Sequence, residues 1–214
     1  MRALTEPELD RAEARLLRVV DGAMADVAGR AGAWLVCGPG CTRCCHTLFP
    51  ITPLDARRLQ RGLAETRRDD PHRARGIEAR ARDAAKTLTD GLPVGSDGRR
   101  LVQDEARLDA FFQRHDGLAC PVLNPATGRC DLYAWRPIAC RTYGPPLRFA
   151  DERTEACDLC FDGAPPEAVE GCRIDPDPDG LEQALLLRMG IEEDATWDTL
   201  IALALIADPA SDGR

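Results

Sequence analysis

The sequence predicts a mainly α-helical protein whose helices pack around an irregular, cysteine-rich segment. Apolar residues recur at helical spacing near both ends of the chain, which indicates amphipathic helices there. Residues 116–180 are instead rich in Pro, Gly, Asp and Cys and show no sustained period. With 214 residues and 44% apolar side chains, the chain can bury a core of its own.

The first helix is predicted over residues 6 to about 30. Thr5 and Glu8 have the spacing of a capping box, in which the two residues satisfy each other's backbone N–H groups at a helix start. The apolar residues that follow share one helix face: Leu9, Leu16, Val20, Met24 and Val27.

The next two helices are predicted over residues 53 to about 68 and over residues 72–89. Thr52 followed by Pro53 is typical of a helix start. The narrow apolar stripe of this helix consists of Leu54, Leu59 and Leu63. The apolar face of the 72–89 helix is mostly alanine, and residues 91–100 after it have the turn chemistry of a loop.

Three further helices are predicted over residues 101–115, 179–189 and 195–207. Their apolar residues are Leu101, Leu108, Phe111 and Phe112 in the first, Leu181, Leu185 and Met189 in the second, and Trp197, Leu200, Ile201 and Leu205 in the third. The irregular segment 116–180 between these helices needs something other than ordinary helix packing to hold it, and a bound metal is the expected agent.

Hydropathy and charge exclude several classes of protein. The first residues lack the apolar stretch of a secretory signal, and the apolar run TLIALALIA is too short to span a bilayer, so we expect a cytoplasmic protein without a membrane partner. The net charge of −8 argues against a nucleic-acid partner, because phosphate binding needs a cationic face. Residues 53–86 carry ten basic and six acidic side chains, a mixture that favours a solvated helix face.

The ten cysteines are the most informative feature of the composition. In a reducing compartment they are more typical of metal ligands or catalytic thiols than of disulfides. They fall into two groups, of which the first is Cys37, Cys41, Cys44 and Cys45, and the second is Cys120, Cys130, Cys140, Cys157, Cys160 and Cys172.

The short spacings in the first group suit thiolate coordination, because a tight turn can aim several sulfurs at one ion, as zinc and iron–sulfur sites require. The adjacent pair Cys44 and Cys45 is harder to assign, since neighbouring residues seldom chelate one tetrahedral ion. The two thiolates either serve different metals, or one is a ligand while the other packs or reacts.

Several motifs resemble the YkgJ-type cysteine-cluster family, a zinc- or iron-chelating domain with the pattern CxxCxxCC. The stretch CGPGCTRCC at 37–45 corresponds to the cluster, CDLY at 130–133 stands where the family has C-x-IY, and RPIACR at 136–141 matches its RP-x-x-CR block. The resemblance covers residues 37 to about 160, with a poorly matched insertion between 60 and 115. It departs from the family in the longer first cysteine spacing and in the leucine before Tyr133.

The resemblance implies metal binding, with zinc and an iron–sulfur cluster both proposed for the family. The ligand set that it implies is Cys37, Cys41, Cys44, Cys45, Cys120, Cys130, Cys140 and Cys157. Cys160 and Cys172 fall outside this eight-cysteine pattern. Sulfur ligation permits both zinc and an iron–sulfur cluster, so the choice of cofactor stays open at this point.

The ligand set also predicts what surrounds it. Four thiolates carry more charge than a zinc ion or a four-iron cluster neutralises, so cations should lie nearby. The expected cations are Arg43, Arg136 and Arg141, which adjoin ligand cysteines, and the expected shields against water are Tyr133 and Trp135. Two alternatives remain for the ligands: His46 completing a three-cysteine site, and oxygen ligation of a mononuclear iron by Asp131, Glu155 or Asp158.

We therefore predict three regions: an N-terminal helix over 1–36, a metal-stapled cysteine-cluster domain over 37–175 with a helical insertion at about 53–115, and C-terminal helices over 176–214 that pack on the same domain. The predicted function is metal binding with a structural, electron-transferring or sensory role, served by an unidentified protein or redox partner. The alternative is a metal-dependent enzyme, for example one that modifies proteins or peptides, with an open coordination position.

Overall fold

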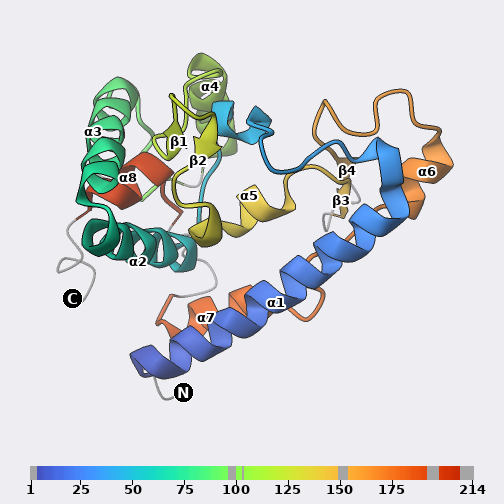
Figure 1. Cartoon of the computed structure of the whole chain (residues 1–214), viewed down its shortest axis with the longest axis horizontal. Helices are drawn as coiled ribbons and strands as arrows, with labels where there is room; N and C mark the ends of the chain where they lie inside the picture. Colours follow the sequence, from blue (N-terminus) through green and yellow to red (C-terminus); the bar gives the residue numbers. More distant parts are fainter. Residues whose placement is uncertain (1–3, 96–99, 103, 149–153, 192–197, 208–214) are drawn as a thin grey trace. The chain divides into compact units, whose positions relative to one another are not determined.

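The structure is a computed structural model that describes residues 4–95, 100–102, 104–148, 154–191 and 198–207. Helices make up 57% of it, which confirms the mainly α-helical class (Figure 1). The chain folds into two units that each combine an early and a late stretch of sequence. The α1 unit contains Met1–Pro39 and Ile138–Glu193, and the α2–α3 unit contains Gly40–Pro137 and Asp194–Arg214. Among the described helices, none is both long and apolar enough to cross a membrane.

The α1 unit is organised around its longest helix, α1 (Glu6–Ala31), against which α5 and α7 pack (Figure 1). The predicted capping box is present at its start, where the Glu8 carboxylate accepts the N–H of Thr5 at 2.9 Å. The buried apolar face of α1 consists of Leu9, Leu16, Val20, Val27 and Ala31. The sequence prediction for this helix is therefore confirmed.

Short elements complete the α1 unit. They are η1 (Gly32–Trp34), α5 (Ile138–Thr142), β3 (Leu147–Arg148), β4 (Thr154–Glu155), α6 (Pro166–Gly171) and α7 (Leu181–Arg188). Strands β3 and β4 form an antiparallel pair, and Leu147 also bridges to Ile174. An apolar cluster joins the end of α1 to these elements through Val27, Ala31, Cys157, Cys160, Phe161, Cys172 and Ile174.

Three helices form the core of the α2–α3 unit: α2 (Pro53–Asp69), α3 (Pro71–Leu88) and α8 (Ile201–Ile206) (Figure 1). The Thr52 hydroxyl and the Asp70 carboxylate cap α2 and α3 by accepting backbone N–H groups in their first turns. The shared core comprises Ile51, Leu59, Leu63, Ala74, Ile77, Ala81, Val122, Leu132, Ala204 and Leu205. The alanines of α3 leave room for α2 and α8 to approach closely.

A second cluster packs α4 (Glu105–Arg114) against the far end of α3. Its buried members are Ala84, Ala85, Leu88, Leu101, Phe111, Leu200, Ala202 and Leu203. The helix predicted over 101–115 begins only at Glu105, because the Asp104 side chain caps it there. The helix predicted over 179–189 spans Leu181–Arg188.

The last predicted helix, over 195–207, is also shorter than expected. Helix α8 spans Ile201–Ile206, because Thr199 lies in an extended bridge that precedes it. Residues 195–197 of that prediction, Trp197 included, lie outside the described residues. The three-region organisation predicted from the sequence stays a prediction.

The irregular segment contributes β1 (Leu123–Asn124), β2 (Arg129–Cys130) and η3 (Tyr133–Trp135) to the α2–α3 unit. The Trp135 side chain packs on α2 at Gly62, where a methyl group would lie 2.6 Å from Trp135 Cδ1 and 2.8 Å from its Cβ. The absence of a side chain at this position therefore allows the ring to dock. Through Trp135, α2 anchors the chain that follows Cys130.

We expect Gly62→Ala to destabilise the protein by about 1–3 kcal/mol, because overpacking at Trp135 outweighs the higher helix propensity of alanine. Gly22→Ala is the matched control, since Gly22 also lies within a helix but a methyl group there would have nothing within 4 Å. Urea unfolding of both variants measures the difference. Equal midpoints for the two variants would contradict the docking of Trp135 on Gly62.

The carboxyl group of Asp198 should make the stability of the protein depend on pH. Burial, followed by the charge of Asp55, raises the pKa of Asp198 from 3.8 to about 6. A raised carboxyl pKa means that the folded state binds the proton more tightly than the unfolded state, so stability is lost as the pH rises from about 4 through 6. We expect Asp198→Asn to stabilise the metal-free protein at pH 7 by about 1–2 kcal/mol after solvent screening, and not at pH 4.

Urea unfolding at the two pH values tests this expectation, with the exposed Asp83→Asn as control. An Asp198→Asn variant whose stability relative to the wild type is the same at pH 4 and pH 7 would show that this carboxyl group does not titrate as described.

Candidate metal centre

Four of the ten cysteines meet in the α2–α3 unit. Cys44 and Cys45 lie in η2 (Arg43–His46), Cys120 lies in the loop before β1, and Cys130 lies in β2. Cys120 donates its N–H to the carbonyl of Cys45 at 2.7 Å, and Cys130 pairs with Leu123 across β1 and β2. The thiols are close enough for the charge of one to act on the others.

The adjacent pair of cysteines is asymmetric. The Cys45 thiol donates a hydrogen bond to the Cys44 sulfur, and this bond, aided by the Arg136 charge and opposed by burial, lowers the pKa of Cys44 to about 7. The same hydrogen bond, together with burial and the charges of nearby thiols, raises the pKa of Cys45. Cys44 therefore ionises first, and as the thiolate it is the better nucleophile and metal ligand of the two.

Cys120 and Cys130 are half-buried, and backbone N–H donors lie close to their thiols. Burial raises the pKa of Cys120 to about 12 and also raises the pKa of Cys130. The N–H groups of Val122 and Leu123 point at the Cys120 sulfur, and that of Leu132 points at Cys130, and these donors oppose the effect of burial. Such N–H donors stabilise the anionic sulfur that metal coordination requires.

Arg136 supplies the cation that the sequence predicted beside these thiols. Its charge favours the thiolate of both Cys44 and Cys130. The guanidinium lies 3.7 Å from the centroid of the Tyr133 ring, and its Nε donates to the Tyr133 carbonyl at 3.1 Å. Arg58 in turn donates to the Arg136 carbonyl at 3.2 Å, which ties this segment to α2.

The other two predicted arginines differ in their position relative to these thiols. Arg43 is part of η2 itself, next to Cys44. Arg141 lies in α5 of the α1 unit, where its Nη1 forms an ion pair with Asp21 at 2.9 Å. Arg141 is therefore engaged with α1, one residue after Cys140.

The remaining predicted ligands are distributed over both units. Cys41 precedes η2 in the α2–α3 unit, whereas Cys37, Cys140 and Cys157 belong to the α1 unit. Cys140 lies in α5 and is half-buried, Cys157 is buried and Cys37 is exposed.

Gly144 brings two of these cysteines near one another within the α1 unit. The Cys37 thiol donates to the carbonyl of Tyr143 at 3.3 Å, and the N–H of Cys157 donates to the carbonyl of Gly144 at 3.1 Å. Gly144 has a φ of +142° and no room for a side chain, since a methyl group there would lie 3.1 Å from Cys37 Cβ. Only glycine fits this approach without strain.

Comparison with known proteins identifies the family. The model of the CxxCxxCC family, described as "Putative zinc- or iron-chelating domain", matches residues 36–160. The chain belongs to the CxxCxxCC family. Membership supports metal binding by the CxxCxxCC domain, with zinc or iron as the metal. Neither a search of curated proteins nor a search of solved structures found a match.

The matched range of the CxxCxxCC domain contains all eight expected ligands and excludes Cys172. Cys160 and Cys172 are buried with Cys157 in the apolar cluster of the α1 unit, where a free cysteine packs as a small apolar residue. None of the ten cysteines, all of which lie in the described part of the chain, forms a disulfide. Within the described ranges, no three His, Cys, Asp or Glu side chains have an arrangement that could hold a metal ion. The fold thus brings the thiols of Cys44, Cys45, Cys120 and Cys130 into one region, but their arrangement is not that of a metal site.

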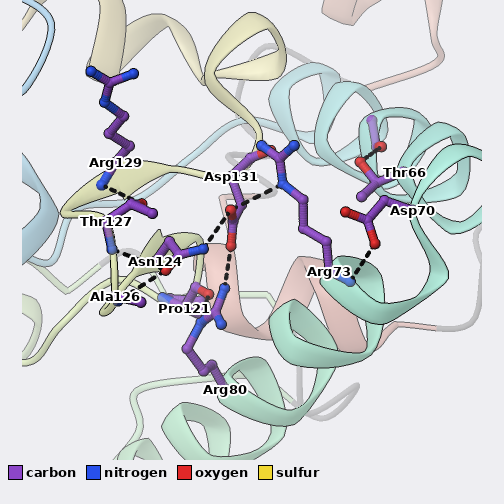
Figure 2. Close-up of polar contacts among 11 residues, drawn as sticks. Thr66, Asp70, Arg73, Arg80, Pro121, Asn124, Ala126, Thr127, Arg129 and Asp131 are labelled. Carbon is purple, nitrogen blue, oxygen red and sulfur yellow. Dashed lines mark hydrogen bonds and ion pairs between the residues drawn. The ribbon is translucent and has the colours of Figure 1, made fainter.

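The alternative ligands have other surroundings. The carboxylate of Asp131 accepts hydrogen bonds from Arg73, Arg80 and Asn124 (Figure 2), so it is committed to protein donors. His46 is half-buried in η2, and the Glu155 side chain lies outside what the structure describes.

The contacts of Asp131 also correct one expectation. The basic segment 53–86 was expected to form a solvated helix face, but Arg73 and Arg80 from this segment pair with Asp131 at 3.0 and 2.7 Å. These two arginines are part of the surroundings of Cys120 and Cys130. The mixed charge of the segment is typical of an exposed helix, so nothing in the sequence indicated that two of its arginines pair with Asp131.

Proposed function

We propose that Cys44, Cys45, Cys120 and Cys130 hold a zinc ion or an iron–sulfur cluster, and that the protein functions as a metal-centre module. The ligand set that we propose for the whole chain also includes Cys37, Cys41, Cys140 and Cys157. The centre would serve a structural, electron-transferring or sensory role in the cytoplasm, with a protein or redox partner of unknown identity.

One observation carries the proposal: the hydrogen bond from the Cys120 N–H to the Cys45 carbonyl joins the backbones of the two cysteine groups. Sulfurs that are far apart in the sequence are thereby placed in one electrostatic group. Among thiols held so close together, each one that ionises raises the cost of ionising the next. A bound cation removes that cost.

The donors around the sulfurs fit such a centre. Cys44 is poised to ionise near neutral pH, and backbone N–H groups point at Cys120 and Cys130. Arg136 offsets part of the negative charge that four thiolates would leave on a zinc ion or a four-iron cluster. When bound, the metal supplies a cross-link between η2 and the β1–β2 hairpin, and an iron–sulfur cluster would add one-electron chemistry.

Anaerobic purification followed by elemental analysis and an absorption spectrum tests the proposal. We expect either colourless protein that contains zinc, which favours a structural role, or brown protein with iron and labile sulfide, which favours electron transfer or sensing. Protein that retains neither metal, and binds neither after reconstitution under reducing conditions, would contradict the proposal.

The ligand assignment gives a second expected outcome. Cys45→Ala and Cys130→Ala should each lower the metal content per chain, because each removes a proposed sulfur ligand. Cys172→Ala is the control, since Cys172 is buried in an apolar cluster and lies outside the matched family range. Metal analysis of the three purified variants measures the effect, and a wild-type metal content in the first two would refute the assignment.

A further inference from the structure

A polar cluster lies beside the two loops that carry Cys120 and Cys130. We call it the Asp131 clamp, and it consists of Arg73, Arg80, Asn124 and Asp131 (Figure 2). The Asp131 carboxylate accepts from Arg73 Nε at 3.0 Å, Arg80 Nη2 at 2.7 Å and Asn124 Nδ2 at 3.1 Å. With its side chain only 6% exposed, this carboxylate needs partners that neutralise it.

Arg80 contacts the residues that follow both cysteines. Its Nε donates to the carbonyl of Pro121 at 2.8 Å while its Nη2 donates to Asp131 (Figure 2). Because Pro121 follows Cys120 and Asp131 follows Cys130, one planar guanidinium spans the two cysteine loops. Arg80 belongs to α3, a helix of the core. The position of each loop is therefore fixed relative to α3.

Backbone hydrogen bonds of the β1–β2 hairpin connect Asp131 to the surroundings of the Cys120 sulfur. The N–H of Asp131 donates to the carbonyl of Val122 at 2.8 Å, and Arg73 Nη2 donates to the Asp131 carbonyl at 2.6 Å. The N–H of Val122 in turn points at the Cys120 sulfur. A shift of Asp131 would therefore move the loop of Cys130. It would also move Val122, whose N–H points at the Cys120 sulfur.

The charge of Asp131 does not explain its position. A carboxylate beside Cys130 repels an anionic sulfur, and a site with four thiolates is already rich in negative charge. If only charge mattered, removing this carboxylate would strengthen metal binding, because Arg73 and Arg80 would then act on the thiolates without opposition. What Asp131 does offer the two loops is the set of hydrogen bonds that links them to α3.

We propose that Asp131 and Arg80 are positioning residues for the proposed metal centre, which fix the loops of Cys120 and Cys130 relative to one another so that both sulfurs can reach one metal. The inference rests on the proposed function, since it assigns these residues a role toward the same thiols. Conserving the charge at position 80 is not enough, because a lysine cannot donate in two directions from one rigid plane.

Titration of reduced, metal-free protein with Co²⁺ tests the proposal, because sulfur ligation gives cobalt a charge-transfer absorption that reports both affinity and the number of thiolates. We expect Asp131→Asn and Arg80→Lys each to weaken Co²⁺ binding by about 10–100-fold and to lower the charge-transfer intensity. Arg82→Lys is the matched control, since Arg82 lies on the same helix but pairs at the surface with Glu78.

The outcomes separate the possible failures. If the wild type shows no sulfur-to-cobalt absorption, the proposed function itself fails. If the wild type binds and Arg80→Lys binds equally well, charge suffices and the positioning role is overturned; tighter binding by Asp131→Asn overturns it as well. Should Asp131→Asn fail to fold, as judged by circular dichroism before titration, Arg80→Lys and Arg73→Gln decide the result, because both leave the buried carboxylate one arginine partner.

Discussion

The cysteine-rich half of the α2–α3 unit depends on one buried ionic interaction, the carboxylate of Asp131 held between two arginines of α3. A carboxylate in this position is costly unless it is paired, so the two arginines stabilise the hairpin that carries it. With Trp135 docked on Gly62 and Arg58 bonded to the Arg136 carbonyl, α2 and α3 hold the loops of Cys120 and Cys130 through protein contacts alone. The proposed metal centre would thus rest on a helical scaffold made of α2 and α3.

The two adjacent cysteines, Cys44 and Cys45, differ in how readily they ionise. Cys44 and Cys45 share one hydrogen bond, so one thiol is readily ionised while the other holds its proton. The backbone of Cys45 meanwhile receives Cys120, which joins the two cysteine groups. If the proposed centre forms, Cys44 would be the thiolate available to a metal at neutral pH, and Cys45 would have to lose its proton on binding.

Local and long-range features differ in how well the sequence predicted them. The capping box at Thr5 and Glu8, the leucine stripe of α2 and the alanine face of α3 are encoded within a few residues, and the structure confirms them. The family motif likewise indicated metal binding. The Asp131 clamp could not be predicted, because its arginines lie 58 and 51 residues away in sequence and have the same composition as an exposed helix face. The helix over 195–207 was predicted too long because strand pairing at Thr199 competes with helix propensity.

The central claim is that sulfur from two distant segments coordinates one centre in the α2–α3 unit. X-ray absorption at the metal edge of the purified protein tests it most directly, since the method reports the elements bound to the metal. We predict a first shell of sulfur, at about 2.3 Å for zinc, that loses a sulfur in Cys44→Ala and also in Cys120→Ala. A shell dominated by oxygen or nitrogen, or one that neither substitution changes, would contradict it.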